Sequence, residues 1–320
     1  KEKLFNPIWQ NKGHIQALKN NGATIIGSVN FRQKVKALLP NEMKTRYDII
    51  FLMTKQLNNK EVVKSLREYL TEDGVICTMQ NGIPELSVAE VIGEDRTYGC
   101  TMAWGANIVK DGVVKLTSKN SPKTLSFGLG SFHNKETPYL KEIKRLLSKM
   151  GNVTIESDLL GTRWAKLLIN SSFNGLSAIM GTTLGGIVKN KRSRWIFLKL
   201  MKECIDVAKK NEIKIGRIQG VDVVKLIDYK SKWKERFSYF ILPIMLRKHK
   251  DSKSSTLQDI EKGKKTEIEA INGVLASFGD KAGIDTPYND RIIQLGKDIE
   301  NEKLRPNMNN IKLFDDMLNK

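Results

Sequence analysis

Three polar side chains recur at helical spacing in the otherwise apolar segment 163–174. Lys166, Asn170 and Asn174 occupy positions i, i+4 and i+8, so a helix would place one ammonium group and two carboxamides on one side. Because the rest of the segment is strongly apolar, we expect these groups to face a cleft. Desolvation lowers the pKa of a lysine and makes it a usable proton donor near neutral pH. The spacing alone also fits an exposed lysine with two asparagines tolerated in a helix.

A second group of candidate residues lies in segment 253–273. Ser254 or Ser255 can cap the start of a helix, and Glu267 follows on the side of that helix that carries isoleucines. We expect the Glu267 carboxylate to meet Lys166, where it would stay ionised and orient the ammonium group. Taken alone, the segment is more often a capped helix with ion pairs between successive turns.

Polar groups also follow two strands expected at 48–54 and 74–79. Lys55 comes directly after the first strand, and Gln80-Asn81-Gly82 follows the second. Open α/β sheets bind ligands at the carboxyl ends of their strands, so the pattern modestly favours a ligand site over a plain turn.

Other catalytic arrangements find no support. The three histidines, His14, His133 and His249, lie in loop-like or basic segments, and the chain has no Gly-x-Ser-x-Gly elbow and no metal-ligand spacing. We therefore predict neither a nucleophilic triad nor a metal site. A Gly-x-Gly-x-x-Gly turn after a strand, the usual cradle of a dinucleotide, is also not found.

The composition is that of a globular protein. With 320 residues, 40% of them hydrophobic and 28% charged, we expect about two domains and no disordered or collagen-like chain. Lys and Arg (54) exceed Asp and Glu (35), which gives a net charge of +19 and favours anionic ligands in general. We interpret the excess as a solvated basic face, because no nucleic-acid motif accompanies it.

The cysteines and the long uncharged segment bear on the compartment and on membrane association. Three scattered cysteines, Cys77, Cys100 and Cys204, exclude a disulfide framework and fit a reducing cytoplasm, and no signal peptide opens the chain. Segment 167–188 is uncharged and long enough to span a bilayer. Its asparagines, hydroxyl residues and glycines instead favour a buried helix followed by a turn.

Periodicity divides the chain into an α/β domain at 1–157 and an all-helical domain at 158–320. The first half alternates apolar runs with amphipathic segments, which is typical of βαβ units. We predict strands at 24–29, 48–54, 74–79, 97–104, 112–117, 123–128 and 152–156, and helices at 59–70, 84–92 and 137–150. In the second half we predict helices at 159–179, 194–211, 221–232, 255–282 and 287–301, with no convincing strand.

Together these segments resemble the ketopantoate reductase (2-dehydropantoate 2-reductase) family. The resemblance rests on the Lys after a strand (Thr54-Lys55), the Gln80-Asn81-Gly82 turn, the Trp-x-Lys-Leu-x-x-Asn-x-x-x-Asn helix from Trp164, the Ser-Ser-x-Leu-Gln-Asp segment from Ser254 with its Thr-Glu-Ile continuation, and Thr286-Pro287 with Asn289. It implies a Rossmann-type domain followed by a helical domain. In this family the first strand, glycine turn and helix would precede residue 5, so that part of the fold is absent from the sequence.

The resemblance implies reduction of a 2-keto acid, above all 2-dehydropantoate to pantoate, by hydride from NADPH, with NADH not excluded. Lys166 would be the general acid, with Glu267 beside it and the nicotinamide ribose. Substrate binding would fall to Asn170, Asn174, Ser255 and Asn81, and cofactor binding to Lys55, Asn81, Ala106 and Glu267. The implied partner is a small 2-keto acid, without nucleic acid or membrane, and a homodimer is left open.

Departures from the family pattern leave alternatives. Asn11-Lys12 stands where relatives often carry an Arg for the 2′-phosphate, Gly175 replaces the usual Pro after Asn174, and Leu184 stands where some members have another Asn. The substrate could therefore be another 2-keto acid. A non-catalytic or cofactor-poor derivative that serves as a binding or assembly module is the main alternative, and anion or nucleic-acid binding through the basic surface is the third.

Overall fold

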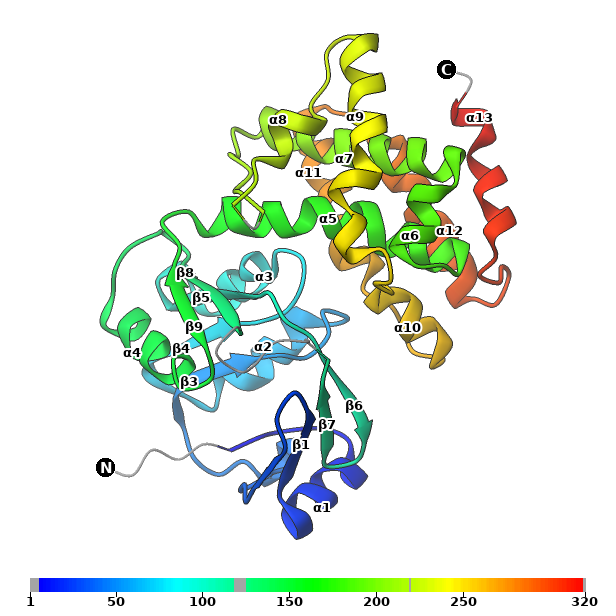
Figure 1. Ribbon diagram of the computed structural model, residues 1–320. Helices are drawn as coiled ribbons and strands as arrows, with labels where there is room; N and C mark the ends of the chain where they lie inside the picture. The colour runs from blue at the N-terminus through cyan, green and yellow to red at the C-terminus, as the bar shows by residue number, and fades with distance from the viewer. Residues whose placement is uncertain (1–5, 118–124, 219, 319–320) are drawn as a thin grey trace. The chain divides into compact units, whose positions relative to one another are not determined.

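A computed structural model describes residues 6–117, 125–218 and 220–318 (Figure 1). The chain divides into two compact units. Unit 1 comprises 1–53, 60–79 and 87–157, and unit 2 comprises 54–59, 80–86 and 158–320. The two short segments that follow strands β3 (Tyr47–Leu52) and β4 (Leu70–Thr78) therefore make most of their contacts with the helical unit.

Unit 1 contains a five-stranded sheet in the order β3-β4-β5-β8-β9. The pairs β3·β4, β4·β5 and β8·β9 are parallel, and β5·β8 is antiparallel. The remaining strands of this sheet are β5 (Thr97–Met102), β8 (Ser126–Ser131) and β9 (Asn152–Ile155), and the helices between them are α2 (Asn59–Arg67), α3 (Pro84–Ile92) and α4 (Pro138–Leu147), with the 3-10 turn η2 (Glu94–Arg96).

Both faces of this sheet are buried. Successive residues of a strand point to opposite faces. Ile76 belongs to the core with Val63 and Val88, whereas its neighbour Cys77 belongs to a second core with Leu140 and Ile143. This explains the continuous apolar strands, and the expected α/β, Rossmann-type class is confirmed.

A smaller four-stranded sheet, in the order β2-β1-β7-β6, completes unit 1. It consists of β1 (Ala23–Gly27), β2 (Phe31–Gln33), β6 (Ala106–Lys110) and β7 (Val113–Leu116), with helix α1 (Lys12–Asn21) and the 3-10 turn η1 (Pro40–Glu42). The sequence analysis did not predict α1, β2 or β6. All five residues of β6 are exposed, so this strand lacks the apolar alternation on which strand prediction depends.

Unit 2 is built from helices around α5 (Leu159–Met180), as expected for an all-helical second half (Figure 1). Its largest apolar cluster includes Trp164, Leu168 and Phe197, each fully buried. The other elements are α6 (Leu184–Lys189), α7 (Lys191–Lys210), α8 (Val223–Ile227), α9 (Lys232–Met245), η4 (Arg247–His249), α10 (Ser255–Glu261), the π-helix η5 (Glu269–Gly273), α11 (Val274–Ala282), α12 (Pro287–Glu300), η6 (Met308–Phe314) and α13 (Asp315–Leu318). Among the described residues, no helix is both long and apolar enough to cross a membrane.

Two helix predictions in this unit were wrong. The segment 221–232 holds only the short α8, and α9 follows it where no helix was expected. The single helix expected over 255–282 is broken into α10, η5 and α11. The break occurs at Gly263, whose φ of +61° ends the first helix in the left-handed conformation that glycine adopts most readily.

Candidate active site

Helix α5 carries the three polar residues singled out from the sequence. The Asp158 side chain accepts a hydrogen bond from the Gly161 amide at 2.9 Å and caps the start of the helix, and Gly181 ends it. Lys166 and Asn170 are half-buried, and Asn174 is 5% exposed. Because their spacing places them on one side of the helix, α5 presents an ammonium group and two carboxamides together.

A fully buried cation precedes Lys166 by three residues. Arg163 is 1% exposed, and its Nε donates a hydrogen bond to Glu85 Oε1 at 3.0 Å, while its Nη1 donates to the Gln80 carbonyl oxygen at 2.7 Å. A buried charge requires such a partner, since desolvation would otherwise cost several kcal/mol. Arg163 therefore joins the 80–86 segment to the helix that carries Lys166. The sequence analysis did not single out Arg163, although a charge in an apolar helix is a recognisable signal.

The Gln80-Asn81-Gly82 turn is fixed at both ends. Gln80 Nε2 donates to the Thr54 carbonyl oxygen at 2.7 Å and to Asn59 Oδ1 at 2.8 Å. Gly82 has a φ of +72°, and a Cβ added there would collide with the Ala270 carbonyl oxygen. Only glycine fits this approach to the π-helix, so the turn presents Asn81 from a fixed backbone.

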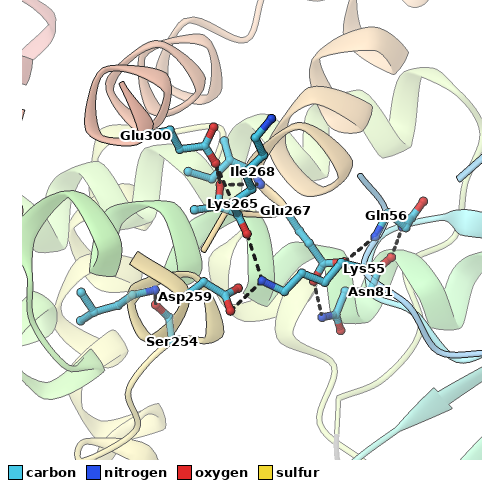
Figure 2. Close-up of polar contacts among 11 residues, drawn as sticks. Lys55, Gln56, Asn81, Ser254, Asp259, Lys265, Glu267, Ile268 and Glu300 are labelled. Carbon is cyan, nitrogen blue, oxygen red and sulfur yellow. Dashed lines mark hydrogen bonds and ion pairs between the residues drawn. The ribbon is translucent and has the colours of Figure 1, made fainter. Parts of the chain in front are cut away.

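Glu267 lies next to this turn (Figure 2). It is 9% exposed, and its Oε1 accepts a hydrogen bond from the Gln56 backbone amide at 3.0 Å. Asn81 Nδ2 lies 3.5 Å from Glu267 Oε2, a long hydrogen bond. The structure thus brings together Asn81 and Glu267, which are far apart in the sequence. The predicted pairing of Glu267 with Lys166 stays a prediction.

Lys55 is held by helix α10 and by the loop that precedes Glu267 (Figure 2). Its Nζ forms an ion pair with Asp259 Oδ1 at 2.7 Å and donates to the Lys265 carbonyl oxygen at 3.0 Å. On the other side of this loop, Thr266 Oγ1 donates to Glu300 Oε1 at 2.6 Å. These contacts fix the two residues that precede Glu267. Asp259 and Gln56 are further site residues that the sequence analysis did not single out, and a backbone contact such as that of Gln56 leaves no signal in the sequence.

The two serines before α10 have different environments. Ser254 is the N-cap: its Oγ accepts from the Leu257 amide at 3.1 Å and lies 3.4 Å from the Asn174 carbonyl oxygen, to which it donates. Ser255, the expected substrate ligand, is the first residue of α10 and is exposed. Ala106, the remaining expected cofactor contact, lies on β6 in unit 1.

The described residues fit one end of a nicotinamide dinucleotide. The Asn81 amide is only weakly engaged, and beside it Glu267 offers a carboxylate acceptor; amide and carboxylate groups of this kind suit a carboxamide and ribose hydroxyls. The pyrophosphate end is not matched: across 6–117, 125–218 and 220–318, no glycine-rich turn joins a strand to a following helix. Asn81 and Glu267 are the residues that would hold the nicotinamide end of the cofactor.

Comparison with protein families gives two matches that together cover most of the chain. The ketopantoate reductase PanE/ApbA family model matches residues 3–129, and the model of the C-terminal domain of the same family matches residues 158–300. The chain belongs to the ketopantoate reductase family. It is thus an oxidoreductase of the NAD(P)H-dependent, 2-dehydropantoate 2-reductase type, as the motifs had indicated.

Individual relatives agree with this family. A 2-dehydropantoate 2-reductase of Pyrococcus horikoshii is 27% identical over 280 residues, which cover 86% of this chain and 83% of the relative. A crystal structure of a PanE/ApbA family ketopantoate reductase from Ralstonia eutropha has a TM-score of 0.76 at 20% identity and covers 92% of this chain and 90% of its own. D-mandelate dehydrogenase in a ternary structure with NADH and anilino(oxo)acetate has a TM-score of 0.73 at 20% identity, with 93% and 91% covered.

Proposed function

We propose that this ketopantoate reductase family member reduces a 2-keto acid, above all 2-dehydropantoate to pantoate, with NADPH as the hydride donor and Lys166 as the proton donor. The single observation that carries the proposal is the buried Arg163. It links the turn that presents Asn81 to the helix that presents Lys166, Asn170 and Asn174. Arg163 would then position the Asn81 turn and the polar side of α5 for binding of one substrate.

Reduction of a ketone places negative charge on the carbonyl oxygen, and that oxygen must gain a proton. When bound, the nicotinamide supplies the hydride. The Lys166 ammonium supplies both a nearby positive charge and the proton, which it donates from Nζ. Asn170 and Asn174 carry amide donors one and two turns further along α5, where they would hold the substrate carboxylate and hydroxyl groups.

The remaining roles follow the family pattern. Asn81 and Glu267 would bind at the junction of substrate and nicotinamide ribose, Ser255 would complete the substrate site, and Lys55 and Ala106 would contact the cofactor. Lys55 would do so from its ion pair with Asp259. Residues 1–157 would then serve dinucleotide binding and 158–320 substrate binding and catalysis, and we expect the enzyme to act in the cytoplasm.

The test is oxidation of NADPH and of NADH with 2-dehydropantoate and with a panel of branched and aromatic 2-keto acids. We expect turnover with NADPH and one keto acid preferred over the others.

In the Lys166→Ala variant, turnover should fall by about 10²–10⁴-fold with the fold retained, because general acid catalysis typically contributes that much. Lys210→Ala, which removes an exposed lysine at the end of α7, is the matched control. Full activity in Lys166→Ala would refute the role of Lys166, and no oxidation with any keto acid would refute the reaction.

A further inference from the structure

The Glu267 carboxylate belongs to a short segment without regular secondary structure. Residues 264–267 lie between helix α10 and the π-helix η5, outside any helix or strand. Glu267 is nevertheless only 9% exposed, and its two oxygens meet the Gln56 and Asn81 amides (Figure 2). A carboxylate on such a segment needs contacts from elsewhere in the chain to keep its place. Helix α12 provides contacts to the residues before and after it.

The residue before Glu267 is held by the last residue of α12 (Figure 2). Glu300 Oε1 accepts hydrogen bonds from the Thr266 backbone amide at 2.7 Å and from Thr266 Oγ1 at 2.6 Å. The same Oγ1 accepts a long hydrogen bond, of 3.4 Å, from the Ile268 amide. One carboxylate of α12 therefore fixes the backbone immediately before Glu267, and through the Thr266 hydroxyl it reaches the residue after it.

The residue after Glu267 packs against a glycine of the same helix. A Cβ added at Gly296 would lie 2.3 Å from Ile268 Cδ1 and 3.5 Å from Ile268 Cγ1 and Cγ2, so Ile268 occupies the space that a side chain at Gly296 would need. Ile268 is 4% exposed and belongs to the largest apolar cluster of unit 2, so it has little room to move aside. Gly296 thus sets how closely the segment that carries Glu267 approaches α12.

Both of these α12 residues are placed against local helix preference. A glycine inside a helix is less favourable than an alanine, because it loses more backbone entropy. A carboxylate in the last turn meets the negative end of the helix dipole. Gly296 and Glu300 are four residues apart, so they lie on the same side of α12. Natural sequences break local preferences mainly at functional sites, and these two residues meet the two neighbours of Glu267.

One turn earlier, α12 contacts α5 beside another candidate site residue. A Cβ added at Gly175 would lie 2.2 Å from Ile292 Cγ2, so the two helices approach closely next to Asn174. Ile292 and Gly296 are again four residues apart. A single helix therefore relates Asn174 and Glu267 in space.

We propose that α12 positions the Glu267 carboxylate, with Glu300 acting through Thr266 and Gly296 acting through Ile268. This inference rests on the proposed function, in which Glu267 binds the nicotinamide ribose. Oε2 of Glu267 has only a long contact with Asn81, so it can accept a hydrogen bond from a ligand hydroxyl. A carboxylate that is already fixed loses less conformational entropy when the ligand binds. We expect a loosened Glu267 to weaken cofactor binding more than it weakens the fold.

Two substitutions of Glu300 test the first contact. Glu300→Leu removes the acceptor, whereas Glu300→Gln keeps an amide oxygen in its place. We expect Glu300→Leu to raise the NADPH dissociation constant about tenfold and to lower kcat, with the KM for the keto acid unchanged. Glu300→Gln should bind NADPH as the wild type does. Gln294→Leu, at an exposed position of the same helix, is the matched control. Nicotinamide fluorescence measures binding, and thermal unfolding shows that each variant folds.

Gly296→Ala tests the second contact. The added methyl group should displace Ile268 and weaken NADPH binding. Gly296→Ala/Ile268→Val should restore binding, because valine lacks the Cδ1 atom that the methyl group meets. Ile268→Val alone measures the effect of the smaller side chain. Recovery in the double variant distinguishes a specific fit of Ile268 from a general loss of stability, and a double variant that binds no better than Gly296→Ala would contradict the role of Gly296.

Hydrogen exchange of the Gln56 amide gives a measurement that needs no activity. This amide donates to Glu267 Oε1, so its exchange should be about tenfold faster in Glu300→Leu and unchanged in Glu300→Gln and Gln294→Leu. Unchanged exchange in Glu300→Leu would overturn the positioning by α12. Faster exchange with wild-type NADPH binding and turnover would overturn its role in cofactor binding. If the wild type neither binds nor oxidises NADPH or NADH, the proposed function fails, and the Gln56 exchange rates still decide whether α12 positions Glu267.

Discussion

Two cations on α5, three positions apart, occupy different environments. Arg163 is fully buried and holds Gln80 and Glu85, whereas Lys166 is half-buried. A guanidinium suits the buried position because it stays charged and presents several donors in a fixed plane. A lysine would suit the proposed proton donation because its pKa responds to its surroundings. Sequence spacing identified Lys166 but gave no sign of the partner of Arg163, because Glu85 lies 78 residues away.

Replacement of Arg163 tests whether this ion pair positions the turn. Arg163→Met removes the guanidinium from the buried Glu85, and we expect the free energy of unfolding to fall by about 3–5 kcal/mol. The double variant Arg163→Met/Glu85→Met buries no carboxylate and should recover much of that loss. Urea unfolding measures both, and a double variant no more stable than Arg163→Met would contradict the pair. If the double variant folds, its kcat should still be reduced, since the Gln80 carbonyl has lost its donor.

At the scale of elements, the site depends on how the 80–86 segment meets the π-helix η5. The strands before Lys55 and Gln80 and the long helix α5 could be predicted, because apolar runs and helical periodicity are local properties. The close approach of Gly82 to Ala270 could not, since it depends on a π-helix that local sequence does not specify. Helix α9 was missed because its apolar residues lie on two sides, one facing the core and the other exposed, and blur a single periodicity.

Gly82→Ala tests this approach directly. Alanine at Gly82 must adopt a φ of +72° and also displace the Ala270 carbonyl, whereas alanine at Gly283, with a φ of +66°, meets nothing within 4 Å. Both variants should lose about 1 kcal/mol or more of stability from the backbone conformation alone. We expect only Gly82→Ala to lose turnover as well, by about tenfold or more, because it shifts Asn81. Measured kcat and KM for the two variants decide this, and equal turnover would show that the turn tolerates displacement.

At the scale of the whole molecule, a buried polar network joins three helices and the π-helix of unit 2. Asn272 Nδ2 donates to the Ser171 carbonyl oxygen and to Asn289 Oδ1, both at 2.8 Å, and Asn289 Nδ2 donates to Glu203 Oε2 at 2.7 Å. Glu203 also accepts from the Tyr288 and Asn289 backbone amides, which caps the start of α12. The sequence analysis singled out Asn289 only for its place beside Thr286-Pro287. The network shows that it connects α12 to α5 and α7, which no local pattern could reveal.

This network should make stability depend on pH. Burial raises the pKa of Glu203 from 4.5 to about 7. Three hydrogen bonds to the carboxylate lower the pKa, but their effect is smaller than that of burial. Between pH 4.5 and about 7, Glu203 keeps its proton in the folded protein but releases it in the unfolded chain. The free energy of unfolding therefore falls as pH rises through this range, by up to about 3 kcal/mol. Lys199 and Lys202 line the same cavity of about 430 Å³, but they form ion pairs with Glu235 and Asp206.

Urea unfolding of the wild type and of Glu203→Gln between pH 4.5 and 8 isolates this contribution. The wild type should lose stability relative to the variant as pH rises to about 7, and the difference between the two should then level off, because the carboxamide of the variant cannot titrate. The three histidines change charge in the same range, but both proteins carry them and their effect cancels in the difference. A difference that stays constant across the range would mean that Glu203 remains ionised throughout, held by its three donors and the amino end of α12.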